Sequence, residues 1–309
     1  MGLVSYLYKK KFVCRYDKEV GVPYYSYQDF VNLRQDSFSF KNSKGDDIHY
    51  FFYYYDNYRV DKVILFCHGL GPGHVAYLRE IECLVKRGYK VLTLDYTGCG
   101  ESSGKNMRSL NQPTRDVIEL LNLLKPKEEI VLMGHSLGGY TALNIINLRN
   151  DIKKAVILSG FLSMPLLLPT FIKSKSIVDK VLKYEKKIDP EYYALDNLMY
   201  LSTTNDKIFF IQSEDDQMVP YINALKVVEE IENPCIRKLR MNHRKHNPNY
   251  TDDAVKYMNG VFGKYYQLIK NKQIKTNQDK INYFKDKSLE RMTNQDQELF
   301  DQIQAFFEQ

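Results

Sequence analysis

The chain has 309 residues and a formal net charge of +6, from 44 basic and 38 acidic side chains. This length suits one large domain with a sizeable core, and so mild a charge balance does not indicate a nucleic-acid-binding protein. The five scattered cysteines include no CxxC pair, so we expect no disulfide scaffold and no metal site, and a reducing cytoplasm fits them best.

The first 35 residues are rich in tyrosine and lysine, have no clear hydrophobic period, and are interpreted as an N-terminal extension. Their opening stretch, MGLVSYLYKKKF, has too short an apolar run for a secretory signal. Tyr6 also stands where the myristoylation pattern needs serine or threonine. No segment approaches the roughly 20 apolar residues that span a bilayer. We therefore expect a cytoplasmic protein without stable membrane insertion.

Strand and helix patterns begin after this extension. Residues 36–42 and 48–56 alternate aromatic and polar side chains around a Ser-Lys-Gly-Asp turn, which predicts a β-hairpin. Further strands are expected at 62–69, 89–95, 129–134, 154–160, 207–213 and 235–241, and helices at 77–88, 114–124, 137–149 and 221–232. Buried strands that alternate with amphipathic helices predict an α/β fold with a mostly parallel sheet covered on both faces.

The interval 164–205 is too long for a simple connection between two of these strands. It holds the apolar stretch MPLLLPTFI, a mixed helical segment at 176–187 and a segment at 189–201 with proline near its start. We interpret the interval as a small inserted helical cap. The alternative is an ordinary crossover helix with a long loop.

The C-terminal segment, residues 264–309, is rich in lysine, asparagine and glutamine and ends in a helical pattern. The apolar face of this last helix holds Leu299, Phe300, Ile303, Phe306 and Phe307. Thr293 and Asp296 have the spacing of a capping box at its start. Packing on the sheet explains this face better than binding a partner does. Since no internal repeat is present, we expect one domain over residues 1–309.

The most informative motif is Gly134-His135-Ser136-Leu137-Gly138, between an expected strand and an expected helix. GxSxG alone occurs by chance, but in this context it is typical of a sharp, strained turn that lifts a nucleophilic serine above the sheet. The alternative is a tight turn with an incidental serine. Ser136 is therefore the candidate nucleophile.

The loop FCHGLGPGH, after the strand that begins at Lys62, is a candidate oxyanion site. A sharp turn there would direct the N–H of Leu70 toward the nucleophile, and the N–H of Leu137 would be the second donor. A phosphate-binding loop is the alternative, but neither GxGxxG nor GxxxxGK[ST] is present.

A nucleophilic serine needs a base, and the base needs an orienting acid. Glu214, Asp215 and Asp216 all follow the strand at 207–213, so the residues alone leave the acid open. His243 and His246 both follow the last expected strand. His246 directly precedes the entry to a helix, which favours it as the base.

With these pieces the chain resembles the α/β-hydrolase fold family, and more closely its bacterial lipase-, esterase- and serine-aminopeptidase-like serine hydrolases. The matching stretches are HGLGPGH, GYKVLTLDYTGCGESSG, GHSLGG, SEDDQMVP and KHNPNYT, in the family's order within residues 36–260.

The resemblance selects Asp216, because family members carry an aspartate three residues before the valine of Val-Pro. It also favours His246, which is followed by asparagine. Lys245 stands where glycine usually precedes this histidine. Asp95 and Ser102, in DYTGCGES, are expected to support the fold.

The implied activity is hydrolysis of a small carboxylic ester, acyl or aromatic, through an acyl-enzyme at Ser136 with no cofactor. Leu166, Leu167 and Phe171 of the cap are expected to line the substrate pocket, although apolar core explains them equally well. The only expected partner is a small-molecule ester, with no nucleic acid.

Several alternatives remain open from the sequence. An amidase or peptidase and a thioesterase share this fold, which does not choose among them. A non-catalytic ligand-binding homologue is disfavoured by the complete set of serine, acid and histidine. A membrane-associated lipase would use the basic tail and the leucine-rich cap.

Overall fold

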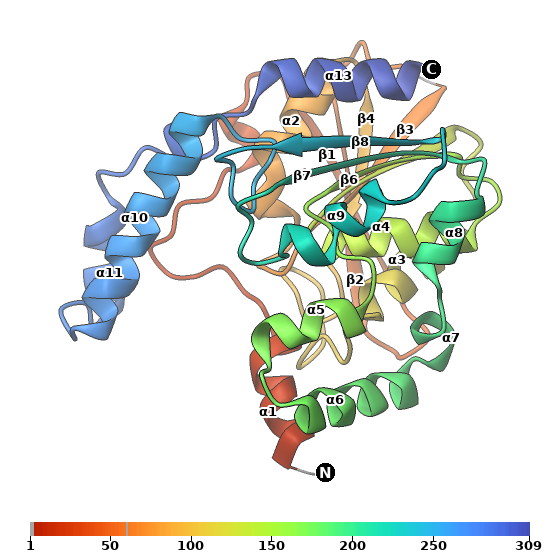
Figure 1. Cartoon of the computed structure of the whole chain (residues 1–309). Helices are drawn as coiled ribbons and strands as arrows, with labels where there is room; N and C mark the ends of the chain where they lie inside the picture. The colour runs from red at the N-terminus through yellow and green to blue at the C-terminus, as the bar shows by residue number, and fades with distance from the viewer. Residues whose placement is uncertain (1–2, 60) are drawn as a thin grey trace.

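The computed structural model describes residues 3–59 and 61–309. Within them, an eight-stranded sheet has the strand order β1-β2-β4-β3-β5-β6-β7-β8 (Figure 1). The strands are β1 (Arg34–Lys41), β2 (Asp47–Tyr54), β3 (Lys62–Cys67), β4 (Lys90–Leu94), β5 (Glu129–His135), β6 (Lys154–Leu158), β7 (Lys207–Ser213) and β8 (Ile236–Met241). The pairs β1–β2 and β2–β4 are antiparallel and the other pairs are parallel. The expected hairpin and mostly parallel sheet are confirmed.

Helices cover both faces of the sheet (Figure 1). Alternate side chains of β3 enter two separate apolar clusters, because successive residues of a strand point to opposite faces. One cluster includes side chains of α3 (Gln112–Leu124) and α4 (Leu137–Leu148). The other includes side chains of α2 (Leu78–Lys86) and α13 (Gln297–Glu308). Burial on both faces explains why β3 reads as a continuous apolar run.

The interval between β6 and β7 is helical, so the cap of the expected fold is confirmed. Its helices are α5 (Met164–Phe171), α6 (Lys175–Ile188), α7 (Pro190–Tyr193) and α8 (Asn197–Thr203). The N-terminal extension contains α1 (Leu3–Phe12), which packs against α6 (Figure 1). No helical period predicts α1 in the sequence, because its buried side is defined by this contact with a distant segment.

Beyond the sheet, α10 (Asp252–Lys270), α11 (Asn277–Phe284) and α12 (Leu289–Met292) form an arm that projects from the body (Figure 1). The apolar face expected for α13 is buried. The expected capping box is wrong: Asp296 caps α13 by accepting from the Leu299 N–H. The Thr293 hydroxyl instead donates to the carbonyl of Leu289.

Short elements complete the chain. The single helix expected at 221–232 is a 3-10 turn, η3 (Tyr221–Asn223), followed by α9 (Leu225–Glu229). Further 3-10 turns are η1 (Tyr27–Asp29) and η2 (His74–Tyr77). Across residues 3–59 and 61–309, no helix has the length and apolar character needed to cross a bilayer.

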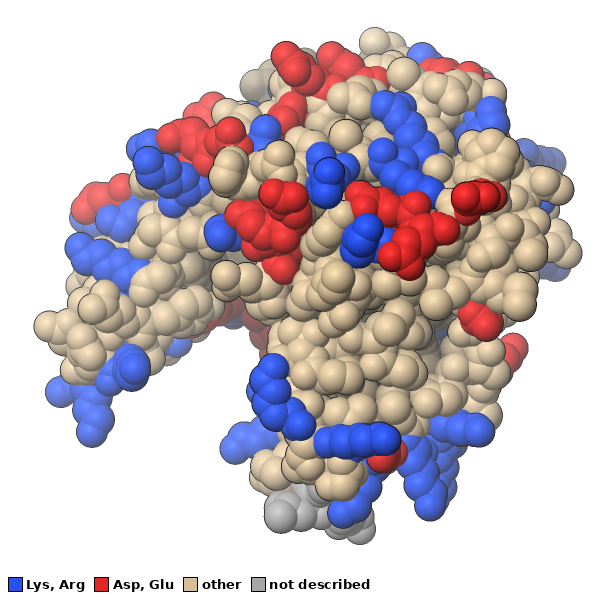
Figure 2. Space-filling view, viewed as in Figure 1, with Lys and Arg blue, Asp and Glu red and all other residues tan. Residues whose placement is uncertain are grey.

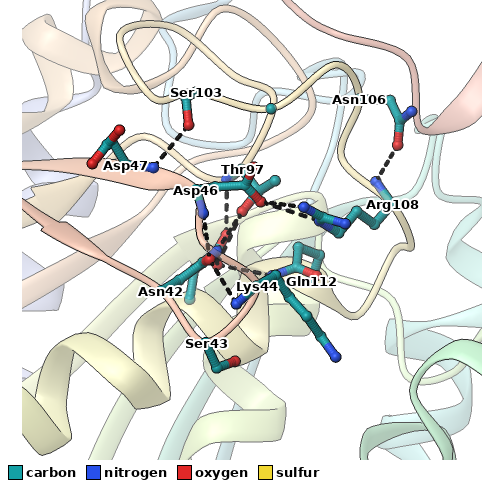
Figure 3. A network of polar contacts seen from close by, with 12 residues as sticks. Asn42, Ser43, Lys44, Asp46, Asp47, Thr97, Ser103, Asn106, Arg108 and Gln112 are labelled. Carbon is teal, nitrogen blue, oxygen red and sulfur yellow. Dashed lines mark hydrogen bonds and ion pairs between the residues drawn. The ribbon is translucent and has the colours of Figure 1, made fainter.

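A buried polar network ties the hairpin turn to the loop after β4 (Figure 3). The Asn42 amide donates to Thr97 and Asp116, each at 3.0 Å, and its oxygen accepts from the N–H groups of Lys44 and Asp46. Burial raises the pKa of the Asp116 carboxyl to about 6 despite these hydrogen bonds. The network fixes the hairpin relative to the loop that follows β4.

The same loop is held from inside by Asp95 and Ser102. The buried Asp95 carboxylate accepts from the N–H of His74 at 2.7 Å and from that of Glu101 at 2.8 Å. The Ser102 hydroxyl donates to the Asp95 carbonyl at 2.5 Å. These contacts are those of residues that support the fold.

Candidate active site

Ser136 forms the turn between β5 and α4, and its backbone is strained. Its φ of 58° and ψ of −119° lie in a region that residues with a side chain seldom adopt. A β-carbon on Gly134 would lie 2.1 Å from the Gly138 oxygen, and one on Gly138 would lie 1.9 Å from the Cys67 oxygen. The motif therefore needs both glycines, and the strained turn that it predicts is present.

Asp216 is held rigidly in the loop after β7. Its Oδ1 accepts from the N–H groups of Met218 at 2.8 Å and Val219 at 3.0 Å. Its Oδ2 lies 2.8 Å from Nδ1 of His246. The carboxylate is buried, so its attraction for the imidazole is little screened by water.

The two neighbouring acids face other partners. Asp215 accepts from the Ser213 hydroxyl at 2.6 Å and from the Lys245 N–H at 2.9 Å. Glu214 is exposed and lies 4.0 Å from the guanidinium of Arg240. Of the three candidate acids, Asp216 is the one bonded to a histidine.

The loop after β8 separates the two candidate bases. His243 is exposed, whereas the His246 side chain is 19% exposed and faces Asp216. Lys245 has a φ of 53°, in the left-handed region that glycine adopts at low cost. Its ammonium pairs with Asp215 at 3.1 Å, in addition to the backbone bond. These bonds hold a lysine in a backbone conformation that glycine adopts more readily.

His135 links the turn that carries Ser136 to His246. Its Nε2 lies 2.7 Å from the His246 carbonyl oxygen, and its Nδ1 lies 2.9 Å from the Tyr77 hydroxyl. Burial and the nearby His246 ring lower the pKa of His135 to about 3, so the ring is neutral near pH 7. A carbonyl only accepts, so Nε2 carries the proton and Tyr77 donates to Nδ1. The Tyr77–His135 pair thus anchors the main chain of His246.

The expected oxyanion loop lies directly against Ser136. A β-carbon on Gly69 would be 3.2 Å from Cβ of Ser136. His68 donates from Nδ1 to the Gly69 carbonyl at 2.7 Å, and burial lowers its pKa to about 4. Leu137 is the first residue of α4, where backbone N–H groups have no partner within the helix. Leu70 and Leu137 both border the cavity described next.

A cavity of about 330 Å³ opens onto Ser136. It is lined by Lys11, Phe12, Tyr16, Leu70, Leu110, Ser136, Leu137, Phe161, Leu167, Phe171, Met218 and Val219. Two of the three expected pocket residues, Leu167 and Phe171, are in this lining. Leu166 is not among the lining residues and packs partly buried against the core.

Sequence reasoning missed Tyr77 of η2, which bonds to His135, and the residues that reach the cavity from α1 and the segment after it. Lys11 and Phe12 end α1, and Tyr16 follows it, in a segment without a clear period. The only local signal was the spacing of Tyr8 and Phe12, whose rings stack with centroids 5.5 Å apart. Among the described residues, no group of three or more histidine, cysteine or acidic side chains is arranged to hold a metal ion.

Comparison with known sequences places these residues in context. A family model described as serine aminopeptidase, S33, matches residues 58–219, which include Ser136 and Asp216 and end before His246. An epoxide hydrolase from Caballeronia sordidicola is 36% identical over 96 residues, 30% of this chain and 29% of that protein. A 2-hydroxy-6-oxononadienedioate/2-hydroxy-6-oxononatrienedioate hydrolase from Escherichia coli is 31% identical over 109 residues, 32% of this chain and 36% of that protein. The chain thus spans about a third of the length of these two relatives.

Solved structures share the fold over most of the chain. An esterase from Pyrococcus furiosus has a TM-score of 0.58 and 18% identity, and the match covers 82% of this chain and 98% of that one. Est1E from Butyrivibrio proteoclasticus, solved with bound ferulic acid, has a TM-score of 0.55 and 16% identity over 74% of this chain and 97% of its own. At these identities the likeness establishes the fold alone.

Proposed function

Because the chain belongs to the serine aminopeptidase S33 family of hydrolases, we propose that it is a serine hydrolase that cleaves small carboxylic esters. Ser136 is the nucleophile, His246 the general base and acid, and Asp216 the residue that orients His246. The hydrogen bond between His246 and Asp216, together with the strained turn at Ser136, is the observation that carries the proposal.

The proposed reaction has two steps. Ser136 Oγ attacks the ester carbonyl carbon while its proton passes to Nε2 of His246, and that proton then goes to the departing alcohol. Water repeats the sequence on the acyl-enzyme and releases the acid. Asp216 keeps Nδ1 of His246 protonated, so Nε2 is free to accept a proton.

The negative oxygen formed in each step needs donors. We assign this role to the N–H groups of Leu70 and Leu137, which are carried by the loop against Ser136 and by the first turn of α4. Both belong to backbone that is already fixed, so little reorganisation is needed during the reaction.

The lining of the cavity supports an uncharged acyl or aromatic group over a peptide with a free amino terminus. Among the described residues that line it, Lys11 is the only charged one, and no acid is present to bind an α-ammonium group. Aminopeptidase activity, although it is in the family's description, is therefore the weaker candidate. Thioesters and uncharged amides remain chemically compatible with the site.

A substrate panel tests the proposal. We expect nitrophenyl esters with short acyl or aryl groups to be hydrolysed, aminoacyl amides to be poor substrates, and Ser136→Ala to lose ester hydrolysis. Faster turnover of aminoacyl amides than of esters would refute the assignment to esters, and full activity of the Ser136→Ala protein would refute the mechanism.

A further inference from the structure

The positive charge of the chain is concentrated on one surface. The ammonium groups of this surface, which we call the lysine face, belong to α1 and to residues 173–188 and are those of Lys9, Lys10, Lys11, Lys173, Lys175, Lys180, Lys183, Lys186 and Lys187. Only Asp179 and Glu185 are acidic in the same segments. The formal net charge of these segments is therefore +7, whereas that of the whole chain is +6. Figure 2 shows the blue side chains gathered along the lower edge of the molecule, over the place of α1 and α6 in Figure 1, while red and blue alternate above.

Among the described residues, the lysines of this face have no acidic partner, whereas several lysines elsewhere on the surface are paired. Elsewhere, Lys86 pairs with Glu82 at 2.5 Å and Lys153 pairs with Asp206 at 3.0 Å. In the part of the chain that the structure describes, no ion pair involves a lysine of the lysine face. Its one exposed acid, Asp179, offsets little of this charge. The surface therefore carries a positive potential with few internal counter-charges.

Apolar side chains are exposed among these lysines. Tyr6 is 56% exposed, Leu7 53% and Ile177 38%. Lysine with exposed leucine and tyrosine is the composition of surfaces that lie at a lipid interface, where apolar groups enter the acyl boundary and ammonium groups stay at the headgroups. Bidentate phosphate contacts and stacking on bases favour arginine, which these segments lack.

The lysine face adjoins the mouth of the catalytic cavity. Lys11 belongs to both. Phe12 and Phe171, which line the cavity beside it, make an edge-to-face contact with ring centroids 5.7 Å apart. Two further apolar residues of the lining, Leu70 and Met218, are 40% and 53% exposed. An acyl chain leaving a lipid layer at this surface would meet apolar side chains on its way to Ser136.

We propose that the lysine face docks the protein on anionic lipid membranes, so that acyl esters enter the cavity from the bilayer. Docking depends on the charge and apolar residues of α1 and α6 alone, whereas the route of the substrate rests on the function proposed above. The partner is a phospholipid surface with net negative headgroups, attracted by several ammonium groups at once.

Vesicle co-sedimentation tests the proposal, with the Ser136→Ala protein used so that no lipid is consumed. We expect binding to phosphatidylcholine vesicles that contain phosphatidylserine, little binding to phosphatidylcholine alone, and weaker binding as salt is added. Changing Lys175, Lys180, Lys183 and Lys187 together to glutamine should lower the partition coefficient at least tenfold, given the attraction of about 1 kcal/mol per lysine.

A matched control changes four exposed lysines outside the lysine face, Lys127, Lys264, Lys270 and Lys285, to glutamine, with the same loss of charge. We expect it to bind vesicles as the parent does. With Ser136 restored, both sets of substitutions should hydrolyse a soluble nitrophenyl ester normally, which verifies folding.

Equal losses in the two variants would overturn the proposal, because binding would then follow net charge rather than this face. Absence of binding to phosphatidylserine vesicles, or tighter binding to an oligonucleotide or to polyglutamate at the same salt, would also overturn it. If vesicles bind but wild-type protein cleaves no ester, the proposed function fails and docking stands. If esters are cleaved and vesicles do not bind, docking alone fails.

Discussion

At the scale of single residues, His243 and His246 provide the sharpest contrast. His246 Nδ1 lies 2.8 Å from a buried carboxylate, whereas His243 is exposed three positions earlier. We expect His246→Ala to lower kcat by about 10⁴-fold or more, and His243→Ala to leave most of the activity. Initial rates with a nitrophenyl ester measure both, and the opposite order of effects would refute the base assignment.

Tyr77 is expected to act on the reaction through its neighbours. Tyr77→Phe removes the donor to Nδ1 of His135 and with it the bond that fixes the tautomer donating to the His246 carbonyl. Because small displacements of a catalytic group are costly, we expect kcat to fall on the order of tenfold with little change in KM. His135→Gln, whose amide can still donate to that carbonyl, should retain more activity than His135→Ala. Equal kcat values in wild type and Tyr77→Phe would contradict this role.

Local chemistry made part of this site predictable. Ser136 is recognisable because a strained turn needs glycines at fixed positions around it, and these appear in the sequence. The acid was not fixed by the residues, since three adjacent carboxyl groups follow β7 and only the folded loop directs one toward a histidine. The role of His135 was invisible for the same reason, because its partners lie 58 and 111 positions away.

At the scale of elements, α1 depends on contacts with the cap. The Tyr8 hydroxyl donates to the buried Glu185 carboxyl of α6 at 2.5 Å, and the Leu110 N–H lies 3.2 Å from its other oxygen. Burial raises the pKa of Glu185 to about 7, with a further increase from Asp189, while the bonds from Tyr8 and Leu110 lower it. Glu185 therefore holds its proton in the folded state at pH values where the unfolded chain releases it.

This pKa sets the pH dependence of stability. The contribution of Glu185 is fully present below the unfolded pKa of 4.5 and is lost as pH rises toward 7. Glu185→Gln stays neutral, so its free energy of unfolding relative to wild type should rise by about 2 to 3 kcal/mol between pH 4.5 and pH 8. Urea unfolding at several pH values measures this, and a difference that does not change with pH would contradict it.

Element boundaries were predictable where the local pattern had one solution. The strand boundaries were predictable, since an apolar run bounded by glycine and polar turns fits a strand that is covered on both faces. The start of α13 was not predictable, because Thr293 and Asp296 can both cap a helix. In the structure Thr293 bonds within α12, and Asp296 caps α13. The first 35 residues gave no helical period, because the buried side of α1 is created by α6.

At the scale of the whole molecule, the cavity joins residues that are distant in the chain. Phe12, Ser136 and Phe171 all line it, although they lie in three separate parts of the sequence. Neither the size of the pocket nor its lining therefore follows from any local motif. The lysine face arises in the same way. Lysines of two separate segments contribute to a mild net charge in the sequence and become a concentrated surface only when α1 packs on α6.

The central claim is that Ser136 is a nucleophile activated by His246. Its most direct test is the mass and peptide map of the protein after reaction with a fluorophosphonate, because this reagent requires an activated serine but no particular substrate. We predict one adduct per chain, located on Ser136, with labelling strongly slowed in His246→Ala and unaffected in His243→Ala. Failure to label, or an adduct on a residue other than Ser136, would contradict the account.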